Sequence, residues 1–360
     1  MAEIVLGIGT SHTPLLSLPA ALWPAYAEGD RRNSELVYPP HGLTMPYSEA
    51  LAYVSPAIRE RMGDQSTFDR QAAACQHALD VLSDTLRSAK ADVTVIISDD
   101  QDEWFYEDNM PAFAVYWGET APVRPRTMPA TGRASEVGLA IRRGYGEEAL
   151  DVPVASGFGR FVIEYLMDHD FDVAHLRYVR ESYGGDVGRR YPTRSGELDY
   201  VRHTAPHEQG LPHGYSFVIK RLLHNEPQGS ILPILQNTCY PPNQVSPRRC
   251  YALGRALAAA IAAWPEPARV AVVASGGLSH FVVDEELDRM ILGGLERKDG
   301  EALQAIPRCR LYSAASESMN WITAGGVLQD TPLQMELVDY VPVYRSPAGT
   351  GGGWAFARWQ

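Results

Sequence analysis

Five short apolar runs, rich in β-branched residues, constrain the fold of this chain more than any other feature. They are EIVLGIGT (3–10), ADVTVIIS (91–98), AFAVYWG (112–118), SILPILQN (230–237) and RVAVVASGG (269–277). Each run is typical of a buried strand. Segments with helical spacing of apolar residues lie between the runs, and such an alternation favours a mostly parallel sheet. The sequence therefore predicts an α/β fold with a mostly parallel or mixed central sheet flanked by helices.

The intervening segments predict helices and two long insertions. Helices are expected from about Tyr47 and at 68–89, 134–147, 159–168, 214–224, 246–263, 284–293 and 313–325. No internal repeat or flexible linker interrupts the chain, so we expect a single catalytic domain over residues 1–360. Loop insertions are expected near 17–60 and 180–212, and long loops in compact domains are often functional. The glycine-rich GTGGGW (349–354) is expected to be a local turn.

Composition excludes several classes of protein. The net charge is −12, which does not suit a phosphate-binding basic face, so we expect no nucleic-acid partner. No apolar run approaches the roughly 20 residues of a membrane span, and we expect no membrane partner. An acid stands near the N-terminus where a signal peptide carries positive charge, and the four cysteines form no CxxC pair. We therefore expect a cytoplasmic protein with reduced thiols.

Polar clusters follow three of the predicted strands. His12 follows the first, the acids at 99–103 with Gln101 follow the second, and His280 follows the last. Because parallel strands point the same way, their carboxyl ends meet at one edge of the sheet. Imidazole and carboxylate ligands with open coordination positions suit non-haem Fe(II). A single histidine is more often structural or exposed, so this interpretation depends on the shared position after strands.

Six segments carry a resemblance to a known family. They are GTSHTPLL (9–16), DDQDEWFYEDNMPAFAVY (99–116), PHG (212–214), NTCYPPNQ (237–244), SGGLSH (275–280) and ASESMNWITAGG (315–326). In this order, over most of the chain, they resemble the class III (LigB-like, type II) extradiol ring-cleavage dioxygenases, a group that includes the beta subunit of protocatechuate 4,5-dioxygenase. The resemblance implies a LigB-like fold and an enzyme that opens a dihydroxylated aromatic ring with O₂.

The resemblance also implies roles for single residues. His12 and Glu317 would bind Fe(II). His280 would bind the substrate and act as acid and base, taking a proton from the ring and later returning one. His213 would be a second catalytic histidine that contacts the substrate. Proton transfer near neutral pH independently favours histidine, whose pKa lies near 7.

One position departs from the family pattern: Gln101 stands where the family has its second iron-binding histidine. Gln101 could ligate the metal through its carbonyl oxygen. Alternatively His41, or a neighbouring acid such as Asp100 or Asp102, could replace it. In a third interpretation the site has lost iron, and the chain is a metal-dependent hydrolase or isomerase, or a protein that binds an aromatic ligand or a partner. A changed ligand set could accompany an unusual ring, such as a hydroxypyridone or an aminophenol.

The resemblance raises the question of partners. The family often works with a small helical partner subunit or fused domain that covers the site. We find no such domain fused here, and expect the segments 17–60 and 180–212 to cover the pocket and the chain to form a homodimer. His203 and His207, within the second segment, are expected to face solvent.

Overall fold

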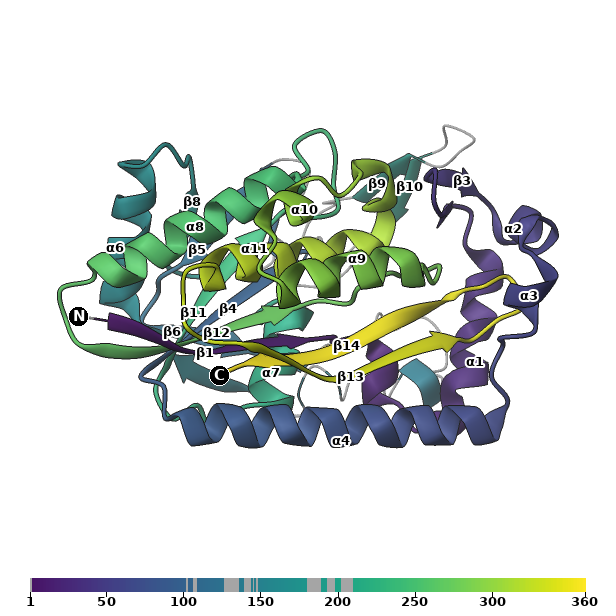
Figure 1. The fold of residues 1–360 in the computed structure, drawn as a ribbon, viewed down its shortest axis with the longest axis horizontal. Coiled ribbons are helices and arrows are strands. Elements are labelled where there is room, and N and C mark those ends of the chain that lie inside the picture. The colour runs from purple at the N-terminus through teal and green to yellow at the C-terminus, as the bar shows by residue number, and fades with distance from the viewer. Residues whose placement is uncertain are drawn as a thin grey trace.

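A computed structural model of the chain has a mixed eight-stranded sheet at its centre (Figure 1). The structure describes residues 2–101, 103–105, 109–125, 136–138, 144, 146, 148–179, 189–192, 198–201 and 210–360. In spatial order the strands are β13 (Met335–Tyr344), β14 (Gly351–Trp359), β1 (Ala2–Thr10), β12 (Ala268–Ser275), β4 (Val93–Asp99), β11 (Ser230–Gln236), β5 (Phe113–Tyr116) and β8 (Ala174–Leu176). The predicted α/β fold with a mixed sheet is confirmed.

The middle of the sheet is parallel. β1, β12, β4 and β11 pair in parallel, whereas β14 and β5 join them antiparallel on either side. The apolar runs that predicted these four middle strands are continuous because helices cover both faces of the sheet. Since the four strands run the same way, their carboxyl ends lie together at one edge.

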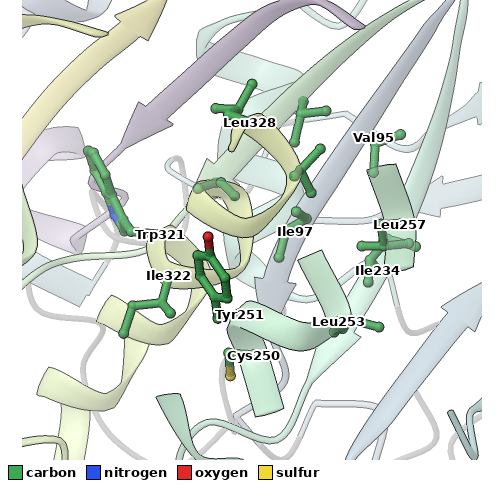
Figure 2. Close-up of a cluster of buried hydrophobic side chains, with 14 of the residues drawn as sticks. Val95, Ile97, Ile234, Cys250, Tyr251, Leu253, Leu257, Trp321, Ile322 and Leu328 are labelled. Carbon is green, nitrogen blue, oxygen red and sulfur yellow. The ribbon is translucent and has the colours of Figure 1, made fainter. Parts of the chain in front are cut away.

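Helices form a layer on each face (Figure 1). One face is covered by α6 (Ser156–Met167), α8 (Pro247–Ala263), α9 (Glu285–Glu296), α10 (Gly300–Gln304) and α11 (Ser318–Leu328), and the other by α4 (Gln65–Ala89) and α7 (His213–Arg221). In the first layer, Tyr251 and Leu257 of α8 and Ile322 of α11 belong to one buried cluster with Val95 and Ile234 of the sheet (Figure 2). This packing holds the start of α11 over the carboxyl end of the sheet.

The segment 17–60 is more ordered than the predicted surface loop. It contains the short helices η2 (Ala20–Leu22), α1 (Trp23–Ala27), η3 (Glu28–Arg32), α2 (Tyr47–Tyr53) and α3 (Pro56–Arg59) and the strand pair β2 (Leu36–Tyr38) and β3 (Leu43–Met45); η1 (Pro14–Ser17) precedes it. Asp30 lies buried against Arg345, with Oδ2 2.7 Å from Nε, and accepts a hydrogen bond from Thr350. This ion pair joins the segment to the C-terminal hairpin.

The C-terminal glycine run is not a turn, contrary to the prediction. Residues 351–354 begin the buried strand β14, which pairs with β13. Glycine is required at Gly353 because a Cβ there would lie 1.8 Å from Asp288 Oδ2. The periodicity of side chains that marks a strand is absent from such a run, so the sequence pattern missed the hairpin.

Two predicted segments lie largely beyond the described residues. Most of the helix expected at 134–147 lies outside them, as do 180–188, 193–197 and 202–209, which include His203 and His207. Between these gaps, β9 (Arg189–Pro192) pairs with β10 (Leu198–Val201), and elsewhere β6 (Thr120–Val123) pairs with β7 (Leu150–Pro153). Within the described residues no helix could span a membrane. The four cysteines are free thiols.

Candidate metal centre

Glu317 lies at the centre of a buried polar cluster at the carboxyl edge of the sheet. It belongs to the short helix η5 (Ser313–Glu317), directly before α11, and is 3% exposed. His12 Nε2 lies 3.3 Å from its Oε2, and His280 Nε2 lies 3.2 Å from its Oε1. The backbone N–H of Gly277 donates to Oε2 at 2.7 Å, and Gln101 Nε2 donates to Oε1 at 2.7 Å. The structure thus brings together four residues singled out from the sequence.

Strand register explains this convergence. Thr10 of β1 pairs with Ser275 of β12, and Ala274 pairs with Ile97 of β4, so the three strands end side by side. The polar residues that follow each strand therefore enter the same space. Gly277 leaves room for the cluster, because a Cβ there would lie 2.6 Å from His280 Cε1.

The hydrogen bonds of His12 define its tautomer. Its Nδ1 lies 2.9 Å from Ser275 Oγ, and that hydroxyl donates its proton to the carbonyl of Gly214 at 2.8 Å. Since a hydroxyl has one proton, Ser275 must accept from Nδ1–H, which leaves the lone pair of a neutral ring on Nε2. Nε2 is buried with no hydrogen-bond partner among the described residues and faces Glu317. A lone pair and a carboxylate at this distance require a proton or a cation between them.

His280 has the same tautomer as His12, but its side chain is more exposed. Its Nδ1 lies 3.0 Å from the carbonyl of Leu278, which can only accept, so Nδ1 carries the proton. Nε2 of the neutral ring therefore faces Glu317 and is the basic atom. The side chain is 16% exposed and lines a small surface hollow together with Tyr38, Pro39 and Tyr312. His280 therefore lies between the buried cluster and this hollow.

His213 is the first residue of α7 and packs beside His12. The two rings are edge to face, with centroids 4.6 Å apart. His213 Nδ1 lies 2.8 Å from Glu103 Oε2, and its backbone N–H donates to the same oxygen at 3.1 Å. One ligand atom from each of His12, His213 and Glu317 lies within 4.8 Å of the others, so these three residues could hold a metal ion.

The other candidates for the missing histidine lie elsewhere or have other partners. His41 is exposed in the turn between β2 and β3 and does not belong to this group, so the structure does not place it as a ligand. Asp100 accepts backbone N–H groups from residues 103, 104 and 105. Asp102 lies outside the described residues. Gln101 donates through Nε2 to Asp99 Oδ2 at 3.1 Å as well as to Glu317.

Charge within the cluster shifts the pKa of several groups. Burial lowers the pKa of His12 and of His280, but the charge and hydrogen bonding of Glu317, with smaller contributions from Asp99 and the Leu278 carbonyl, raise both above their ordinary value. Burial raises the pKa of Glu317, but the two imidazoles lower it by more, and it lies well below its usual range. Burial, aided by the charge of Glu317, raises the pKa of Asp99. The metal-free site therefore holds protons that a cation would displace.

Sequence reasoning missed Glu103 and Ser275 as parts of this site. Glu103 was visible only as one of several acids after a strand, and its partner His213 lies 110 positions away. Ser275 stands in the SGGLSH segment, but nothing local shows that its hydroxyl contacts the imidazole of His12. Both residues fix the tautomer of a histidine, and such contacts become visible only in three dimensions.

Comparison with known proteins agrees with this site. The family described as the catalytic LigB subunit of aromatic ring-opening dioxygenase matches residues 197–316, which contain His213 and His280 and end one residue before Glu317. Gallate dioxygenase of Pseudomonas putida is 58% identical over 38 residues, which are 11% of this chain and 11% of that protein. This relative is therefore matched over only a small part of its length. The matches support the resemblance seen in the motifs: residues 197–316 of this chain are similar to the catalytic LigB subunit of aromatic ring-opening dioxygenases.

Proposed function

We propose that this protein is a non-haem Fe(II)-dependent dioxygenase of the extradiol type that opens a small dihydroxylated aromatic ring, or a hydroxypyridone or aminophenol analogue, with O₂. The observation that best supports this proposal is the position of His12 Nε2. This buried atom lies 3.3 Å from the Glu317 carboxylate and has no hydrogen-bond partner among the described residues. Histidine and carboxylate ligands with open positions suit Fe(II). The donor set therefore fits the metal that the family resemblance implies.

His12 and Glu317 would hold the metal. When bound, Fe(II) supplies the redox chemistry and adjacent positions for the ring hydroxyls and O₂. The protein supplies orientation: Ser275 fixes the imidazole of His12, and the Gly277 N–H fixes one oxygen of Glu317. Such contacts behind the ligands keep a site in its binding geometry.

His280 would move the proton. Its Nδ1–H is held by the Leu278 carbonyl, so Nε2 is the atom that takes a proton from a ring hydroxyl and later returns it. Histidine exchanges protons near neutral pH, which suits this transfer. Its side chain lines the hollow, so a substrate bound there would lie beside this base.

The hollow beside His280 marks the side from which a substrate would approach. Tyr38, Pro39, Tyr312 and Ala315 are among the residues that line it. Tyr38 and Pro39 belong to the 17–60 segment, which would thus cover the pocket without a separate helical subunit. The homodimer expected from the sequence stays a prediction, which light scattering of the purified protein can check.

The test is reconstitution of the full chain with Fe(II) under argon, followed by addition of air-saturated buffer and one substrate at a time. We expect O₂ consumption matched to loss of the ring absorbance with at least one catechol, hydroxypyridone or aminophenol. His169→Ala, which removes an exposed histidine on the surface, is the matched control and should behave like the unchanged protein. Iron retained in the protein without O₂ uptake on any of these rings would refute the function.

A further inference from the structure

We propose that His213 is the third protein ligand of the metal site and occupies the role of the histidine that Gln101 replaces. The inference rests on the proposed function only for the identity of the metal. It changes the role that the family resemblance implied for His213, from substrate contact to metal ligand. The site would then consist of two histidines and one carboxylate, His12, His213 and Glu317.

His213 lies close to the two other candidate ligands. Within the part of the chain that the structure describes, these three residues form the group of ligand-type side chains whose donor atoms lie within 4.8 Å of one another. All three are buried, with exposed fractions of 4% for His12, 8% for His213 and 3% for Glu317. The two imidazoles pack edge to face, with 4.6 Å between their centroids, so the rings lie side by side at the cluster.

The tautomer of His213 suits a metal ligand. A carboxylate can only accept, so the 2.8 Å contact with Glu103 Oε2 places the ring proton on Nδ1 and the lone pair of the neutral ring on Nε2. Glu103 also binds the backbone N–H of His213, which fixes the residue as well as the ring. Metal-ligating histidines almost always donate their second N–H to a carboxylate, a carbonyl or water, and this pair has that arrangement.

The Gln101 amide is oriented as a hydrogen-bond donor. Its NH₂ group lies between two carboxylate oxygens, Glu317 Oε1 at 2.7 Å and Asp99 Oδ2 at 3.1 Å. Flipping the amide would place its carbonyl oxygen against both carboxylates, so the hydrogen bonds determine which atom is nitrogen. An amide NH₂ has no lone pair to offer a metal. Gln101 therefore orients Glu317 by donating a hydrogen bond to its carboxylate.

The experiment measures metal binding and does not depend on turnover. The full chain is loaded with Co(II) alone, and the proton NMR spectrum is searched for exchangeable imidazole N–H signals shifted by the paramagnetic ion. We expect one such signal from Nδ1–H of His12 and one from Nδ1–H of His213. His213→Ala should lose one signal and weaken Co(II) binding by at least about 100-fold, since even loss of a residue behind a ligand costs about 10–100-fold.

Three further variants distinguish ligation by His213 from ligation by Gln101 and from misfolding. Gln101→Ala should keep both signals, although its Co(II) affinity should fall because Glu317 loses a donor. His213→Gln, which preserves more volume, should lose the same signal as His213→Ala if the effect is ligation and not misfolding. His169→Ala should match the unchanged protein in signals and affinity.

Two results would overturn the assignment: both signals persisting in His213→Ala and His213→Gln, or the second signal arising from another histidine. Its failure is distinguishable from failure of the proposed function. A protein that binds Co(II) through His213 but opens no ring keeps the ligand assignment and loses the function. A protein that opens rings but keeps both signals without His213 keeps the function and loses the ligand assignment.

Discussion

The Nδ1 atom of His213 donates to Glu103 Oε2 at 2.8 Å, and the two residues are 110 positions apart in the chain. Glu103 follows β4, whereas His213 begins α7, so the contact joins the sheet edge to the helix that covers it. The carboxylate both fixes the ring orientation and raises the basicity of the opposite nitrogen.

Replacing Glu103 should therefore weaken metal binding without removing a ligand. We expect Glu103→Ala to lower Co(II) affinity by about 10–100-fold, and Glu103→Gln to lower it less, because a glutamine carbonyl can still accept from Nδ1–H. Titration of each metal-free variant with Co(II) measures the effect. Equal affinities for the unchanged protein and Glu103→Ala would show that this hydrogen bond does not support a metal ligand.

Replacing His280 should separate proton transfer from metal binding. We expect His280→Ala to retain iron and to lose about 10²–10⁴-fold in kcat, the usual contribution of a positioned acid or base. Iron content by atomic absorption and kcat by O₂ uptake are measured on the same sample. Normal turnover in this variant would contradict the acid/base role, and loss of iron would instead assign His280 to the metal.

Acid should release the metal. Because Glu317 raises the pKa of His12 above its ordinary value of 6.5, the metal-free site holds a proton that the cation must displace. Affinity should therefore fall as the pH is lowered, beginning above pH 6.5, and binding should release protons. Co(II) dissociation constants measured from about pH 8 to about pH 5.5 test this, together with proton release in weakly buffered solution. A constant affinity over the range would refute it.

The Asp30–Arg345 ion pair should contribute strongly to stability. Both side chains are buried, and Arg345 donates to both carboxylate oxygens of Asp30. Removing one partner leaves a buried charge, so Asp30→Ala should lower the free energy of unfolding by about 3–5 kcal/mol. Urea unfolding measures this, and Glu28→Ala is a control because its ion pair with Arg31 is exposed. Equal losses in the two variants would contradict the argument.

Asp288 should make stability depend on pH near neutrality. It is buried, accepts from Ser279 and Tyr340, and burial raises its pKa from 3.8 to about 7. Because the folded chain binds this proton more tightly than the unfolded chain, stability should fall as the pH rises from about 4 to about 7. The loss from this group is about 4 kcal/mol at most.

Asp288→Asn removes this titration and should show a smaller loss of stability across that window. Comparing urea unfolding of the two proteins at several pH values isolates the group, since other titrating residues contribute to both. Parallel stability curves would show that Asp288 titrates normally.

The local pattern of apolar residues was sufficient to predict the parallel strands in the middle of the sheet. Each apolar run that predicted β1, β4, β11 and β12 is a strand, and the helix expected at 68–89 is α4 (Gln65–Ala89). These elements carry strong local signals, because strands buried on both faces need continuous apolar residues. The C-terminal hairpin carries no such signal, since β14 begins in glycines that fit close neighbours such as Val343 and Asp288.

The sequence by itself determined that His12, Gln101 and His280 lie at one edge of the sheet, because they follow strands that point the same way. Only the tertiary structure decided what each does there. It placed Glu103 behind His213 and turned the Gln101 amide toward Glu317 and Asp99. Hydrogen-bond partners between residues more than 100 positions apart leave no local trace in a sequence. They depend on register and helix packing, which the whole core determines.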